Sequence, residues 1–171
     1  MTRLFARFRV FLGFLSGIAV FVLARPTKQT IVIGLPIVLA GEAIRIWAAG
    51  HLNKSREVTR SGPYRFVAHP LYLGSSLIGA GLAVGAGSIA VVVIVAAYLL
   101  LTLSAAIRSE EAFLREKFGA AYDEYKGQRV VDRTRRFSWQ QAMANREYRA
   151  VAGVVAAALL LIFKATYNGM F

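Results

Sequence analysis

The sequence LYLGSSLIGAGLAVGAGSIAVVVIVAAYLLLTL, residues 71–103, runs for 33 positions without a charged side chain. A helix needs only about 20 apolar residues to cross the hydrocarbon core of a bilayer, so this run is too long for one span. Near its middle, Gly85-Ala86-Gly87-Ser88 has the small residues that favour a tight turn. The run therefore predicts two membrane helices joined by a turn, of which the first, at Leu71–Val84, is short.

Three further apolar runs surround this pair, at Phe8–Ala24, Thr30–Ala49 and Val151–Phe163. Hydrophobic residues make up 57% of the 171 positions. The pattern predicts an all-α integral membrane bundle of about five transmembrane helices, in a single domain of residues 1–171. The more polar Ser104–Lys126 is expected to continue as a helix that leaves the membrane. Gln140–Arg149 is expected to form an interfacial helix before the last span.

Lysine and arginine are concentrated in three segments, with three at the N-terminus, four in residues 51–70 and ten in residues 104–149. These 17 of the 21 basic residues share one side of the membrane if the chain crosses it five times. Because basic loops favour the cytoplasmic side, we expect the N-terminus inside and the C-terminus outside. The net charge of +12 would suit nucleic acid. The basic residues alternate with apolar runs, however, so the expected partner is the lipid bilayer and not nucleic acid.

Three polar motifs lie at the predicted cytoplasmic boundary. They are SGPYRFVAHPLYLG at residues 61–74, Glu110-Glu111, and FGAAYDEY at residues 118–125. Their order and spacing resemble those of the isoprenylcysteine carboxyl methyltransferase and phospholipid methyltransferase superfamily. The signature of that superfamily reads Gly-Pro-Tyr, Arg-His-Pro-x-Tyr-x-Gly, Glu-Glu and then Phe-Gly-x-x-Tyr-x-x-Tyr. The resemblance covers Gly41–Val131, with one departure, because Ala68 stands where the family usually has arginine.

The resemblance implies a small integral membrane enzyme that uses S-adenosylmethionine. Its acceptor would be lipophilic or membrane-embedded, such as an isoprenylcysteine-type carboxylate or a phospholipid-like amine. The motifs then assign eight residues to the cofactor site: Tyr64, Arg65, His69, Leu71, Tyr72, Gly74, Glu110 and Glu111. A carboxylate suits a cofactor that carries a cationic amino group and a sulfonium, and we expect Glu110 as the ligand with Glu111 as its support.

The residues alone leave other interpretations of these positions open. The two glutamates could be surface groups that pair with Arg108 or Arg115, and Gly74 could serve helix packing. Tyr122 and Tyr125 could pack on an amphipathic face or anchor the chain at the membrane interface.

Glu42 and Arg45 are charged residues inside the second apolar run. Being three residues apart, they lie on one helix face. Exposing charged side chains to lipid costs free energy, so we expect both to face the interior of the bundle. They could form a buried ion pair, or Arg45 could extend to the headgroups. The resemblance favours a catalytic role, because Arg45-Ile46-Trp47 matches a family Arg-x-Trp element. Arg45 would then orient an anionic acceptor group, and Glu42 or His69 would be the base for an amine or phenol.

Other chemistries have less support in the sequence. It lacks cysteine, an HExxH motif and a Gly-x-Gly-x-x-Gly motif, so we expect neither a metal site nor a Rossmann-type cofactor site. Two alternatives to a methyltransferase remain. One is an NADPH-dependent membrane reductase of the sterol-reductase type. The other is a non-enzymatic membrane protein that retains the scaffold.

Overall fold

The computed structural model describes residues 2–54, 56–127, 132 and 134–169, and of residues 2–10, 12 and 14 it describes only the backbone. These residues form α1 (Thr2–Leu23), α2 (Lys28–His51), the 3₁₀-helix η1 (Gly62–Arg65), α3 (Pro70–Gly85), α4 (Ile89–Phe118), α5 (Ala120–Lys126), α6 (Trp139–Ala144) and α7 (Glu147–Tyr167). No strand occurs within the described ranges, which confirms the all-α prediction.

Among the described helices, α2, α4 and α7 are long and apolar enough to cross a membrane. The helix α3 is apolar but has only 16 residues. At 1.5 Å per residue it extends for about 24 Å, which is shorter than a hydrocarbon core of about 30 Å. The predicted count of about five spans is thus supported for three helices. For α1 and α3 it stays a prediction.

The turn predicted between the third and fourth apolar helices is confirmed. The helix α3 ends at Gly85 and α4 begins at Ile89. Gly87 has φ +62°, and a Cβ atom at this position would lie 2.5 Å from the carbonyl oxygen of Arg25. Glycine is therefore required here for both its backbone conformation and its lack of a side chain.

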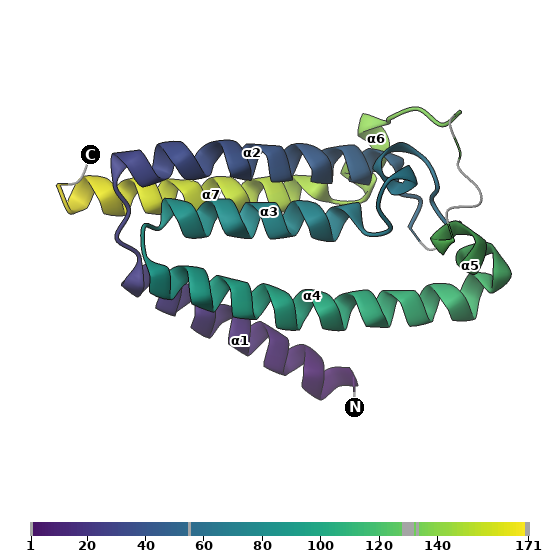
Figure 1. Ribbon diagram of the computed structural model, residues 1–171, viewed down its shortest axis with the longest axis horizontal. Helices are drawn as coiled ribbons and strands as arrows, with labels where there is room; N and C mark the ends of the chain where they lie inside the picture. The colour runs from purple at the N-terminus through teal and green to yellow at the C-terminus, as the bar shows by residue number, and fades with distance from the viewer. Residues whose placement is uncertain (1, 55, 128–131, 133, 170–171) are drawn as a thin grey trace.

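The helices α2 and α3 pack through glycines. A Cβ atom on Gly34 would lie 2.4 Å from the Gly81 carbonyl oxygen, and one on Gly41 would lie 2.7 Å from that of Gly74. Small residues of this kind let helix backbones approach closely. The helix α7 lies beside α2 and α3, whereas α4 contacts α3 on another side and α1 packs against α4 (Figure 1).

Two boundaries differ from the sequence prediction. The helix expected over Ser104–Lys126 is instead the end of α4 followed by α5, because Gly119 takes φ +50° and redirects the chain. The interfacial helix expected over Gln140–Arg149 is interrupted at Arg146, which has φ +60°. Both breaks turn the chain back toward the bundle. Together with η1, the short helices α5 and α6 gather at one end of the molecule, opposite the C-terminus (Figure 1).

Candidate functional site

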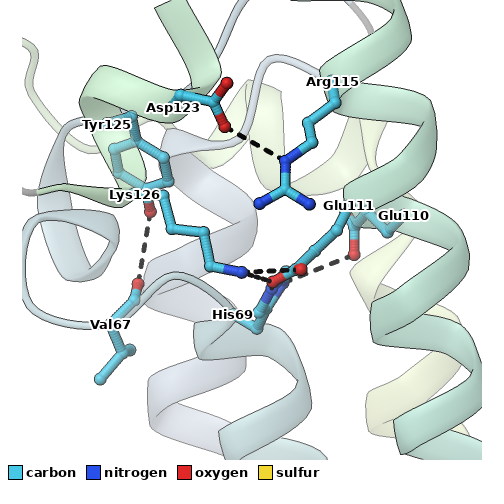
Figure 2. Close-up of polar contacts among 8 residues, drawn as sticks. All are labelled: Val67, His69, Glu110, Glu111, Arg115, Asp123, Tyr125 and Lys126. Carbon is cyan, nitrogen blue, oxygen red and sulfur yellow. Dashed lines mark hydrogen bonds and ion pairs between the residues drawn. The ribbon is translucent and has the colours of Figure 1, made fainter.

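His69 faces two adjacent glutamates of α4 (Figure 2). The start of α3 places it at the end of the molecule that holds η1, α5 and α6 (Figure 1). Its Nε2 is 3.2 Å from Oε1 of Glu111, and its Nδ1 is 3.7 Å from Oε2 of Glu110. Pro70 is the first residue of α3, so His69 occupies the N-cap. The residue before proline avoids the helical region, so the loop ends at His69 and the helix begins at Pro70.

Lys126 completes this cluster from the end of α5. Its Nζ lies 2.7 Å from both carboxylate oxygens of Glu111. The motifs in the sequence do not include Lys126, and only the break at Gly119 brings α5 back against α4. Arg115, which could have paired with the two glutamates, instead bonds Asp123 at 3.1 Å (Figure 2).

Tyr72 adds an aromatic ring beside the histidine. The two ring centroids are 5.7 Å apart with an angle of 36° between the planes. Tyr72 follows His69 by three residues, and such a spacing at the start of a helix brings the two side chains to one face. We call His69, Tyr72, Glu110, Glu111 and Lys126 the His69 site.

The other residues that the resemblance assigned to the cofactor have different surroundings. Tyr64 is buried in η1, and its carbonyl oxygen accepts a hydrogen bond of 2.8 Å from the Tyr125 hydroxyl. Arg65 is exposed, with its guanidinium 4.6 Å from the centroid of the Phe66 ring. Leu71 packs against the tyrosine cluster of Tyr64, Tyr122 and Tyr125, as does Ala68, which replaces the family arginine.

Gly74 faces α2 rather than the His69 site. A Cβ atom there would lie 2.6 Å from both Cγ of Arg45 and the carbonyl oxygen of Gly41. These contacts agree with the packing interpretation of this glycine.

The tyrosine cluster fixes the loop that precedes α3. The Tyr125 hydroxyl also lies 3.5 Å from the carbonyl oxygen of Val67 (Figure 2). Tyr122 is fully buried, and its burial raises the pKa of the phenol to about 12. Burial also raises the pKa values of Tyr64 and Tyr125 above that of an exposed tyrosine. All three phenols are therefore neutral near pH 7 and cannot act as bases there.

A second polar cluster lies deeper, between α2, α3 and α7. Arg45 donates from Nε to Oε1 of Glu147 at 2.8 Å and from Nη2 to Oε2 at 3.2 Å. Its Nη1 donates to the Ser75 hydroxyl at 2.6 Å. Arg45 is six residues before the end of α2, about 9 Å along the helix axis. The ion pair considered between Glu42 and Arg45 is thus wrong. Arg45 pairs instead with Glu147, the first residue of α7.

Glu42 lies one turn before Arg45 on α2 and is buried, with 8% of its surface exposed. Neither of its carboxylate oxygens has a hydrogen-bond partner among the described residues. We call Glu42, Arg45, Ser75 and Glu147 the α2–α7 polar cluster. Its fourth member could not be found from sequence, because it is 102 residues from Arg45.

Comparison with known proteins gives one match. A family model described as phospholipid methyltransferase matches residues 30–121, more than half of the chain. The matched segment includes His69, both glutamates and Arg45, whereas Lys126 and Glu147 follow it. No curated protein and no solved structure matches the chain.

Proposed function

Because the chain belongs to the phospholipid methyltransferase family, we propose that it transfers the methyl group of S-adenosylmethionine to a lipophilic or membrane-embedded acceptor. The observation that carries the proposal is the contact of His69 with Glu110 and Glu111. These residues come from separate motifs of the matched segment, yet they lie together at one end of the bundle. A site of this kind would bind one ligand with groups from α3 and α4.

The donor set of the His69 site fits a cationic ligand. Both oxygens of Glu111 are bonded to Lys126, which leaves Glu111 as a support for His69. The Glu110 side chain is 40% exposed, and its contact with His69 is longer. Glu110 therefore has the freer carboxylate for the amino group and sulfonium of S-adenosylmethionine. Arg65 and Tyr64 belong to the loop that would cover such a ligand.

When bound, S-adenosylmethionine supplies a methyl group already activated by a positive sulfur. The protein then has to hold the reactants in line and exclude water. The hydrogen bond from Tyr125 to the Tyr64 carbonyl holds the covering loop. His69, placed at the start of α3 and bonded to Glu111, would position the cofactor side of the site.

The α2–α7 polar cluster is the proposed acceptor side. This cluster lies farther from the end of the bundle than the His69 site does. A lipophilic acceptor would bring its reactive group to this depth. Glu42 can accept a proton from an amine or hydroxyl acceptor, since its oxygens have no other described partner. Arg45 would contribute positive charge to the same wall.

We also propose that the His69 site faces the cytoplasm, where S-adenosylmethionine is made. The distribution of basic residues supports this orientation.

Titration of the purified protein with two ligands tests the proposed function. S-adenosylhomocysteine should bind and NADPH should not. Binding of NADPH alone would support the membrane reductase, and binding of neither would support a protein that keeps only the scaffold. Comparing the lipids of cells with and without the gene would then identify the acceptor.

A further inference from the structure

Three of the five N–H groups of the Arg45 guanidinium are already bonded within the protein, two of them to one carboxylate. Arginine binds carboxylates through two parallel N–H groups. In this protein Glu147 already occupies such a pair, with donor distances of 2.8 and 3.2 Å. The remaining Nη1 bonds Ser75, whose hydroxyl in turn donates to the Leu71 carbonyl at 2.9 Å. This differs from the role expected for Arg45 from the sequence.

Glu147 is fixed in this position by the backbone. It is the first residue of α7 and is buried, and Arg146 before it has φ +60°. A carboxylate at a helix N-terminus is stabilised by the helix dipole. Glu147 is therefore a built-in partner of Arg45, and a ligand carboxylate would have to displace it.

The net charge of the cluster favours a cationic ligand over an anionic one. Glu42 and Glu147 contribute two carboxylates against one guanidinium in the α2–α7 polar cluster. When ionised, Glu42 can only accept hydrogen bonds, and its oxygens lack described partners. A buried carboxylate of this kind needs a hydrogen-bond donor or a cation.

We propose that Glu147 is a specificity-determining residue, which masks Arg45 so that the α2–α7 polar cluster rejects anionic acceptor groups. The cluster instead admits a cationic or hydrogen-bond-donating group, which bonds Glu42. The inference rests on the proposed function in one respect, because it takes this cluster as the acceptor side. Glu147 lies outside the segment matched by the family, so this specificity is a property of this chain's last helix.

The experiment compares two amphiphiles with the same alkyl chain, dodecylammonium and dodecanoate. Their binding to the protein in a neutral maltoside detergent is measured by calorimetry near pH 7. Wild-type protein should bind dodecylammonium about tenfold more tightly than dodecanoate, or better. Non-specific attraction cannot produce this order, because the net charge of +12 favours the anion.

Variants then test the role of Glu147. Glu147→Gln should raise the affinity for dodecanoate by about tenfold, because Arg45 becomes free to bind it. Adding Arg45→Gln should remove that gain. If Glu147 had only a structural role, its replacement would not raise the affinity for dodecanoate. The matched control is Glu57→Gln, which removes a carboxylate that pairs with Arg135 and should change neither affinity.

Equal affinities of the wild type for the two amphiphiles would overturn the proposal, as would unchanged dodecanoate binding in a folded Glu147→Gln variant. If Glu147→Gln does not fold, the wild-type comparison decides alone. S-adenosylhomocysteine binding is measured on the same samples. Its absence from wild type would contradict the proposed function, whereas the amphiphile preference tests only the specificity of the cluster.

Discussion

Nε2 of His69 lies 3.2 Å from Oε1 of Glu111, although 42 residues separate them in the chain. Between them the chain runs along α3, turns at Gly87 and returns along α4. The contact therefore depends on the length of both helices and on the turn, and not only on the motifs at either end. Lys126 fixes the glutamate from a third helix.

Gly41→Ala should destabilise the protein by about 1–3 kcal/mol, because the new Cβ atom would overlap the α3 backbone. Thermal unfolding in detergent measures the effect as a lower midpoint. Gly153→Ala is the matched control, since a Cβ atom there meets no described atom within 4 Å. Alanine also has the better helix propensity. An equal loss in both variants would contradict the close packing of α2 and α3.

Tyr122 should make stability depend on alkaline pH. The pKa of this phenol is about 12 in the folded protein, against an ordinary value of 10.0. The folded state thus holds the proton more tightly, so this contribution is complete below pH 10 and is lost as the pH rises toward 12. Unfolding midpoints across this range should fall more steeply for wild type than for Tyr122→Phe. Tyr148→Phe, at an exposed position, should behave as wild type.

The predictability of this fold and site depends on how far apart the interacting residues are. The helices α2 and α3, the apolar part of α4 and the turn at Gly87 follow from local composition, and the structure agrees with them. The approach of His69 to Glu110 and Glu111 was expected only through the family motifs.

Glu147 and Lys126 could not be placed in the same way. Glu147 reaches Arg45 because α7 packs beside α2, and Arg146 adopts a left-handed conformation that is uncommon for a residue other than glycine. Lys126 reaches Glu111 because the chain breaks at Gly119 instead of continuing as one helix. Both contacts arise from tertiary packing, for which the local sequence has no signal.

A reporter fused to the C-terminus should be on the outer side, and one inserted beside Lys126 on the cytoplasmic side. The reason is that 17 of the 21 lysines and arginines lie in the three segments assigned to the cytoplasm. Accessibility to a membrane-impermeant reagent distinguishes the two sides. Finding both reporters on the same side would contradict a single crossing of the membrane by α7, between Lys126 and the C-terminus.

The two polar clusters should separate under mutation. Arg45→Ala should leave S-adenosylhomocysteine binding nearly intact and abolish turnover, because the acceptor side loses the guanidinium that holds Glu147 and Ser75 in place. His69→Ala should instead weaken binding. Arg45→Ala also leaves Glu147 buried without its partner, at a cost of about 3–5 kcal/mol. Unfolding curves must therefore accompany the calorimetry. Equal losses of cofactor affinity in two folded variants would place Arg45 in the cofactor site or in a purely structural role.

The most direct test of the central claim is calorimetric titration of S-adenosylhomocysteine into wild type, Glu110→Ala and Arg115→Ala. Glu110→Ala should weaken binding by about tenfold or more, about 1.4 kcal/mol, because a charge-assisted contact is lost. Arg115, whose side chain is 51% exposed and bonds Asp123, should be replaceable with little change. No binding to wild type, or equal losses in the two variants, would contradict a cofactor site at Glu110 and His69.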